Sequence, residues 1–290
     1  MRILLTGGKG MLGRTLRREL SGHDVFVADL PEVDILDPAS LCVAFRSFCP
    51  EVTVHCAAMT KVDDCETDRE MAYRLNEDGS RNVAAVCREF GSRMIAISTD
   101  YVFSGDVGAV GVDGAHEEGW KETDIASPRT VYGASKLAGE RAIFDVLPDA
   151  TVLRIAWLYG AGGPSFVHTM AALGARDGAP LKVVDDQRGN PTSAKVVADE
   201  IRFLLERPEV CGVVHGTCSG VCSWYDLTVE LFRLLGFSRE VMPCTTAEFP
   251  RPAPRPAYSA LSNTVLALLG YSTPDWRTAL SGFVKEEFGR

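Results

Sequence analysis

The chain has 290 residues, of which 46% are hydrophobic and 24% charged, close to the averages of soluble globular proteins. Its net charge of −9 argues against a general binder of nucleic acid or anionic membranes, because such proteins present a basic face. The length corresponds to about two domains. The nine cysteines are odd in number and scattered, which predicts free thiols rather than a disulfide scaffold.

The first half of the chain alternates strand-like and helix-like segments. Short apolar runs predict strands at 2–6, 24–29, 52–56, 93–98 and 151–156. Helical spacing of apolar residues predicts helices at 11–20, 38–48, 68–90, 130–146 and, at the end of the chain, 275–288. Strands that are almost continuously apolar and alternate with helices are typical of a doubly wound parallel sheet, the Rossmann architecture.

Beyond residue 157 the pattern loosens, and no linker separates two domains. We expect a dinucleotide-binding Rossmann domain over 1–157, to which the chain returns at about 192–222, and a smaller, interleaved substrate-binding lobe over 158–290. The segment 104–119 holds five glycines and is expected to be a loop, either a mobile lid or a tolerated insertion.

Targeting and metal signals are weak. Only three apolar residues precede the first glycines, which is too short for a signal-peptide core, and the uncharged stretch 155–175 is broken by glycine and proline. We therefore expect no membrane contact and a cytoplasmic location. Cys218 and Cys222 lack a second Cys/His pair nearby, so no metal site is expected.

A glycine motif follows the first predicted strand and opens the first helix. In Thr6-Gly-Gly-Lys-Gly-Met-Leu-Gly13, Gly7 permits a tight turn, Gly10 lets backbone approach a pyrophosphate, and Gly13 lets the helix pack closely. The helix N-terminus presents N–H groups to phosphate. We expect a dinucleotide at Gly7, Lys9, Gly10, Met11, Leu12 and Gly13. The alternative is a tight turn without a ligand.

An acidic residue closes the second predicted strand. Asp29 is placed to accept hydrogen bonds from the adenosine ribose and to repel a 2′-phosphate, which favours NAD(H). Lys9 could instead meet a 2′-phosphate, so both NADPH and NADH stay open as cofactors.

A catalytic set is indicated by Tyr132-Gly-Ala-Ser-Lys136, in which the phenol and the ammonium lie one helical turn apart. An ammonium beside a phenol is expected to lower the pKa of the phenol, which then exchanges a proton near neutral pH. Thr99, at the end of the fourth predicted strand, could hold a substrate carbonyl oxygen.

Taken in order, TGGKGMLG, STDYVF and YGASK resemble the extended short-chain dehydrogenase/reductases. HCAAMTKVDDCE, RIAWLYG, DDQRGNPTSA and RPAPRPAYSALSN are similar to the dTDP-4-dehydrorhamnose reductase family over nearly the whole chain. The resemblance implies hydride transfer from NAD(P)H to the C4 ketone of dTDP-4-dehydro-L-rhamnose. A nucleotide sugar is the implied partner, and a homodimer is a possible assembly.

The resemblance also assigns roles to residues. Thr99, Tyr132 and Lys136 match the catalytic set, Lys136 also binding the nicotinamide ribose, and Asn76 matches a residue that supports the proton relay. Residues matched to the cofactor lining are Ala57 and Ala58. Those matched to the sugar or nucleotide-sugar segments are Thr60, Asp100, Tyr101, Trp157, Gln187, Asn190, Pro191 and Thr192, and Arg251 or Arg255 could meet the diphosphate.

The sequence departs from the family pattern at three places. The glycine-rich insertion follows Phe103. His55 stands where the family usually has asparagine, and we interpret it as a strand-end residue facing the cofactor pocket rather than a catalytic acid. Arg14 and Thr15 occupy a region where some members carry an acidic metal contact, so no metal ligand is assigned.

Two other functions stay open at this point. One is an epimerase or dehydratase of the same superfamily, although a dehydratase needs an Asp-Glu pair where this chain has Asp100 and Tyr101. The other is a non-catalytic, dinucleotide-binding regulatory subunit, like that of methionine adenosyltransferase. The complete Thr-Tyr-Lys set argues against it.

Overall fold

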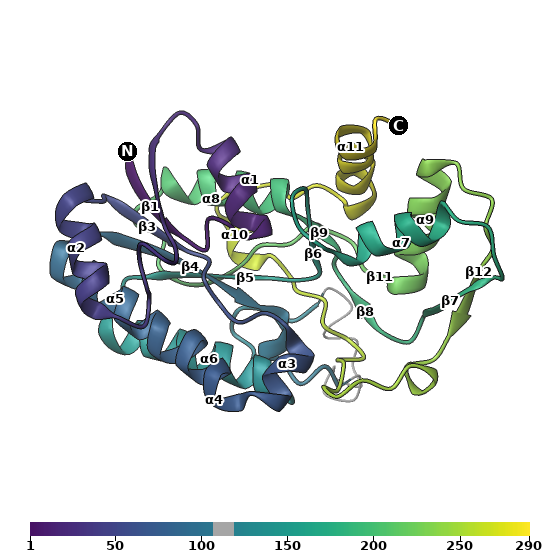
Figure 1. The fold of residues 1–290 in the computed structure, drawn as a ribbon, viewed down its shortest axis with the longest axis horizontal. Helices are drawn as coiled ribbons and strands as arrows, with labels where there is room; N and C mark the ends of the chain where they lie inside the picture. Colours follow the sequence, from purple (N-terminus) through teal and green to yellow (C-terminus); the bar gives the residue numbers. More distant parts are fainter. Residues whose placement is uncertain (107–118) are drawn as a thin grey trace.

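A six-stranded parallel sheet forms the centre of the larger lobe (Figure 1) in the computed structural model, which describes residues 1–106 and 119–290. The sheet runs in the order β10-β5-β4-β3-β1-β2. The strand order reverses next to β1, and ligands bind outside the carboxyl ends of strands at such a reversal. The strands are β1 (Arg2–Thr6), β2 (Asp24–Ala28), β3 (Val52–His55), β4 (Arg93–Thr99), β5 (Thr151–Ile155) and β10 (Gly212–His215).

Helices cover both faces of the sheet (Figure 1). On one face, Leu16 of α1 (Met11–Glu19), Ile201 of α8 (Ala194–Leu205) and Leu266 of α10 (Thr264–Leu268) share a core with the strands. On the other face the core is built from the sheet and α2 (Pro38–Phe48), α5 (Gly79–Phe90) and α6 (Val131–Val146). The prediction of a doubly wound Rossmann sheet is therefore confirmed.

The predicted single helix over 68–90 is wrong in detail. It begins as α4 (Arg69–Tyr73), passes through a π-turn at Arg74–Asp78, and continues as α5. A separate helix, α3 (Val62–Thr67), precedes it. The π-turn brings the buried Asn76 amide to Met59, and interruptions of this kind are frequent at functional sites.

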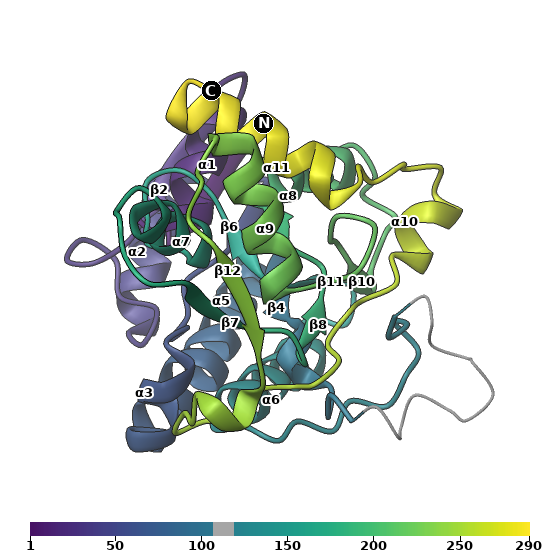
Figure 2. The ribbon, with the colours of Figure 1, turned by 90° about the vertical axis from the view of Figure 1, so that its right-hand side faces the viewer.

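A second lobe lies beside the first (Figures 1 and 2) and has its own core. Its helices are α7 (Phe166–Gly174), α9 (Trp224–Leu235) and α11 (Trp276–Phe288), which confirms the predicted last helix. Three two-stranded sheets complete it: β7 (Leu181–Val184) with β12 (Val241–Cys244), β8 (Arg188–Gly189) with β11 (Cys222–Ser223), and β6 (Leu158–Tyr159) with β9 (Thr192–Ser193).

The chain crosses between the lobes several times. After β6 and α7 it returns to the first lobe, where α8 packs in the core and β10 joins the sheet edge beside β5. The 3₁₀ turn η3 (Thr246–Glu248) opens a strap, residues 249–262, whose Leu261 pairs with Trp120. The bounds predicted for the two domains remain a prediction.

Two expectations concern segments outside this core. Among the described residues, no helix has both the length and the apolar character needed to cross a membrane. Residues 107–118 of the predicted loop lie outside the described residues, and its start, Ser104–Asp106, lines a pocket described below.

The buried carboxyl group of Glu200 lowers the stability of the fold when it is ionised. Glu200 on α8 is fully buried, and within residues 1–106 and 119–290 neither carboxylate oxygen has a hydrogen-bond partner. Burial raises the pKa of Glu200 well above its usual value. A carboxyl with a raised pKa in the folded state stabilises the fold fully only below its unfolded pKa, and that contribution is lost as pH rises through the folded pKa.

We expect Glu200→Gln, which keeps the shape and removes the charge, to become increasingly stabilising relative to wild type as pH rises from 5 to 8. The gain reaches at most about 1.4 kcal/mol per pH unit. Urea unfolding at several pH values measures it. Glu206→Gln, at the exposed end of the same helix, is the matched control. A difference between variant and wild type that does not change with pH would contradict the assignment.

Candidate active site

The glycine loop between β1 and α1 packs tightly against the residues that follow β3. A Cβ on Gly7, whose φ is +69°, would lie 2.6 Å from the backbone nitrogen of Ala57, and one on Gly13 would lie 2.2 Å from the Gly7 oxygen. The α1 N-terminus carries no side-chain cap and no acid in its first turn. Its N–H groups are thus presented to an anion, as dinucleotide binding requires.

Asp29 has a structural role in this loop. Its carboxylate accepts hydrogen bonds from the backbone nitrogens of Gly7 at 2.5 Å and Lys9 at 2.8 Å. The Lys9 ammonium donates to the Leu30 carbonyl and lies 3.5 Å from Glu32. Both side chains therefore hold the loop, and the predicted contact of either with an adenosine ribose or 2′-phosphate stays a prediction.

The three predicted catalytic side chains meet at the carboxyl end of β4. Thr99 ends this strand, and Tyr132 and Lys136 lie on the first turns of α6, all three buried. The Thr99 hydroxyl donates to Asp100 Oδ1 at 2.9 Å, and the same hydroxyl acts to lower the pKa of the Tyr132 phenol. The fold thus places Thr99 of β4 beside the helix that carries Tyr132 and Lys136, and their catalytic role stays a prediction.

The expectation that Lys136 lowers the pKa of the Tyr132 phenol is wrong. Burial raises the pKa of Tyr132 above its usual value, and the Thr99 hydrogen bond offsets this only in part. Lys136 Nζ donates to the Ile97 carbonyl at 2.8 Å, and burial lowers its pKa to about 8 while Glu140 opposes the shift. The loss of hydration outweighs the pairing inferred from the i, i+4 spacing.

Asn76 ties the π-turn to the catalytic helix. Its amide nitrogen donates to Ser135 Oγ at 2.9 Å and to the Met59 carbonyl, while its oxygen accepts from the Met59 nitrogen at 2.8 Å. Ser135 Oγ donates in turn to the Tyr132 carbonyl at 2.9 Å. The side chain of Asn76 is therefore occupied by positioning bonds. Ser135, within the YGASK motif, was not assigned this role from the sequence.

Asp100 is buried and accepts the hydrogen bond of the Thr99 hydroxyl. Burial raises its pKa to about 6, and the hydroxyls of Ser259 and Thr99 oppose the shift. Ser259 also accepts from Trp157 Nε1 at 3.2 Å. The sequence did not single out Ser259, although it stands in the segment RPAPRPAYSALSN that matched the family.

Trp157 is packed rather than open. Its φ is +45°, a region that non-glycine residues rarely adopt, and its indole stacks on Trp224 with ring centroids 3.5 Å apart. A Cβ on Gly189 would lie only 2.5 Å from this indole. Strain of this kind persists where the surroundings fix the residue, often near a ligand site. Trp224 is an aromatic wall that the sequence did not single out.

The other predicted sugar contacts are spread over both lobes. Gln187 accepts from Trp224 Nε1 and donates to Thr246, and Asn190 donates to the Gly220 carbonyl and accepts from Leu261 N. These two amides hold the second lobe. Among the smaller residues assigned from the resemblance, Pro191 and Thr192 are buried, Ala57 and Ala58 half-buried, and Thr60 exposed.

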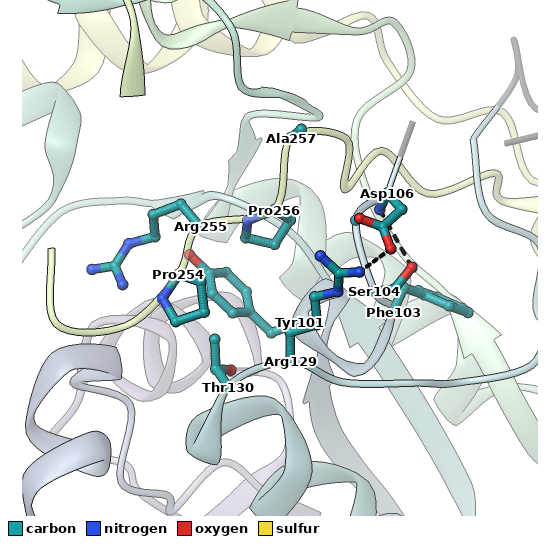
Figure 3. A pocket seen from close by; sticks show the side chains of 11 residues that line it. Tyr101, Phe103, Ser104, Asp106, Arg129, Thr130, Pro254, Arg255, Pro256 and Ala257 are labelled. Carbon is teal, nitrogen blue, oxygen red and sulfur yellow. Dashed lines mark hydrogen bonds and ion pairs between the residues drawn. The ribbon is translucent and has the colours of Figure 1, made fainter. Parts of the chain in front are cut away.

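Arg255 is engaged within the protein. It pairs with Asp63 Oδ2 of α3 at 2.9 Å, and Asp63 Oδ1 accepts from Ala253 N. Beside it, a cavity of about 120 Å³ is lined by Tyr101, Arg129 and the strap (Figure 3). This volume falls below the several hundred Å³ typical of ligand pockets. It can therefore form only part of a nucleotide-sugar site.

A buried ion pair joins the elements that carry the site. Glu140 of α6 and Arg154 of β5 contact each other at 2.9 and 2.6 Å, and each side chain is 5% exposed. Ser98, adjacent to Thr99, donates to the same carboxylate at 2.5 Å. The pair and Ser98 link α6, β4 and β5 next to the predicted catalytic residues on these elements.

The fold and this constellation define a class: a Rossmann-fold protein with a glycine-rich dinucleotide loop and a Thr-Tyr-Lys set at the carboxyl edge of its sheet. The chain belongs to the RmlD substrate binding domain family, whose model matches residues 1–288.

Curated relatives and solved structures match nearly the whole chain. A probable dTDP-4,6-dihydroxy-2-methyloxan-3-one 4-ketoreductase of Streptomyces antibioticus is 43% identical over 97% of this chain and 93% of its own length. The structure of a dTDP-4-dehydrorhamnose reductase from Clostridium acetobutylicum matches with a TM-score of 0.92 and 40% identity, covering 99% of both chains. That of the Bacillus anthracis enzyme, in complex with NADP, matches with a TM-score of 0.91 and 35% identity, also over 99% of both chains.

The contacts of Asp100 lead to a testable shift. We expect Ser259→Ala to raise the pKa of Asp100 above about 6, because a hydrogen bond to the carboxylate favours its ionised form. Titration of the side-chain carboxyl carbons by ¹³C NMR measures this pKa. Ser262→Ala, which removes another hydroxyl of the same strap, is the control. An unchanged or lowered pKa in Ser259→Ala would show that the hydroxyl does not support the carboxylate.

Proposed function

We propose that the protein is an NAD(P)H-dependent reductase that converts the C4 ketone of a dTDP-4-keto-6-deoxysugar into an alcohol, with dTDP-4-dehydro-L-rhamnose as its substrate. The observation that carries the proposal is the buried Thr99–Tyr132 hydroxyl pair at the same sheet edge as the glycine loop. The named activities of the relatives support it.

The residues of the loop fit a dinucleotide. Glycine at positions 7 and 13 leaves the backbone uncovered where any side chain would collide, and the uncapped α1 N-terminus offers donors to a pyrophosphate. When bound, the nicotinamide supplies a hydride. The Bacillus anthracis relative was solved with NADP, which supports NADPH as a cofactor of this chain; Asp29 keeps NADH open.

Tyr132 is suited to act as the acid. Because burial raises the pKa of its phenol, the group keeps its proton at neutral pH until charge develops on the substrate oxygen. Its proton then passes to the C4 oxygen, and the Thr99 hydroxyl turns from Asp100 to hydrogen-bond that oxygen. Asp100 and Tyr101 lie beside this point and are proposed to contact the sugar.

Lys136 assists from one turn further along α6. Its ammonium donates to the Ile97 carbonyl, and its lowered pKa of about 8 leaves it mostly protonated at pH 7. A cation here stabilises the phenolate that forms as Tyr132 gives up its proton. We propose that it also binds the nicotinamide ribose.

A second candidate differs in the sugar and not in the chemistry. The Streptomyces antibioticus relative is described as a 4-ketoreductase of another dTDP-linked keto sugar, and its 43% identity favours testing that substrate class equally. Oxidation of NADPH and NADH against a panel of dTDP-4-keto sugars separates the two. Failure with every sugar would refute the proposed function.

The proposal extends to a cytoplasmic location and a homodimer. All nine cysteines are free in the structure, as expected of a protein kept in a reducing compartment. Fractionation of the producing cell tests the location, and sedimentation velocity tests the assembly.

We expect Tyr132→Phe to lower kcat by about 10²–10⁴-fold, because the general acid is lost, with the Kd for NADPH nearly unchanged. Stopped-flow NADPH oxidation and fluorescence titration measure the two quantities. Tyr271→Phe, whose ring packs against Phe203 in the core beneath the sheet, is the control. A folded Tyr132→Phe enzyme with wild-type turnover would disprove the assignment of the acid.

A further inference from the structure

His55 is a buried polar residue with both ring nitrogens occupied. It ends β3 and is 1% exposed. Its Nδ1 lies 2.7 Å from Thr6 Oγ1 and its Nε2 lies 3.1 Å from Ser80 Oγ. Burial, assisted by the Lys136 charge, lowers its pKa to about 3, so the ring is neutral at physiological pH. The sequence predicted a strand-end residue facing the cofactor pocket; in the structure the ring ends β3 and bridges β1 and α5.

The direction of each hydrogen bond is determined by its partners. Ser80 Oγ donates its one proton to the Asn76 carbonyl at 2.7 Å, so it accepts from His55, which fixes the proton on Nε2. Nδ1 is then an acceptor, and Thr6 Oγ1 donates to it. Thr6 Oγ1 in turn accepts from Ala57 N at 3.3 Å. The result is one oriented chain running Ala57, Thr6, His55, Ser80, Asn76.

The two ends of this chain lie at the two halves of the site. Ala57 N is the atom that packs against Gly7 of the cofactor loop. Asn76 continues through Ser135 to the backbone of Tyr132. A neutral imidazole, with one donor and one acceptor on opposite sides of a rigid ring, satisfies both hydroxyls at once. A charged ring would offer two donors and could no longer accept the proton of Thr6 Oγ1.

We propose that His55 is a positioning residue, whose neutral ring fixes the cofactor loop relative to the Asn76 turn and so aligns a bound dinucleotide with Tyr132. The inference rests on the proposed function, because it assumes that the loop binds NAD(P)H. The two hydrogen bonds of the ring then have different effects. The bond to Thr6 supports cofactor binding, and the bond to Ser80 supports the placement of α6 with Tyr132.

Four variants test this separation. His55→Phe fills the same space and removes both bonds, and we expect it to weaken NADPH binding by roughly tenfold, the effect of one lost buried hydrogen bond. His55→Gln, which keeps an acceptor and a donor, is expected to restore most of the affinity. Thr6→Val should raise the Kd for NADPH, whereas Ser80→Ala should lower kcat with the Kd near that of wild type.

The measurements are NADPH fluorescence titration, which needs no turnover, and steady-state kcat, with thermal unfolding to confirm the fold. Thr53→Val is the matched control. Thr53 lies on β3, as His55 does, but further from the carboxyl end of the strand, and the variant removes its buried 2.9 Å hydrogen bond with the Ser92 hydroxyl. We expect it to lower stability without changing the Kd.

The proposal is overturned if folded His55→Phe has the Kd for NADPH and the kcat of the wild type. It is also overturned if Thr53→Val raises the Kd as much as His55→Phe does. If His55→Phe does not fold, the test rests on Thr6→Val and Ser80→Ala. A wild-type Kd for NADPH in Thr6→Val together with a wild-type kcat in Ser80→Ala would overturn the proposal. If the wild-type protein binds neither NADPH nor NADH, the proposed function itself fails, a result distinguishable from any of these.

Discussion

The buried pair of Glu140 and Arg154 is the constraint on which the site depends. Two charges removed from water are stable only with close, well-directed partners, and losing one partner leaves an uncompensated buried charge. The pair has two contacts below 3 Å and a third partner in Ser98. Because Thr99 follows Ser98 and Lys136 precedes Glu140 by one helical turn, the geometry of this pair becomes the geometry of the catalytic groups.

Burial also determines the proton states of the site. The pKa of the Tyr132 phenol is raised and that of the Lys136 ammonium is lowered, both shifts favouring the neutral form of the group. His55 is neutral for the same reason. The site thus holds a protonated phenol within a network of oriented hydrogen bonds.

The net charge of −9 looked unfavourable for anionic ligands, and the structure changes how it should be interpreted. Lys9 and Arg255, two of the cations expected to meet the anionic ligands, are paired with Glu32 and Asp63. The N–H groups of α1 are the donors proposed to meet phosphate at the loop, and they act at short range whatever the charge of the whole chain.

The sequence by itself determined the features that local patterns encode. These are the alternating strands and helices, the glycine loop between β1 and α1, and the placement of Tyr132 and Lys136 on one helix face, since each depends on residues a few positions apart. Only the tertiary structure decided the π-turn at Asn76 and the contact of Ser259 with Asp100. It also decided the direction of the Lys136 ammonium, because hydrogen bonds between distant segments and the loss of hydration exist only after the chain has packed.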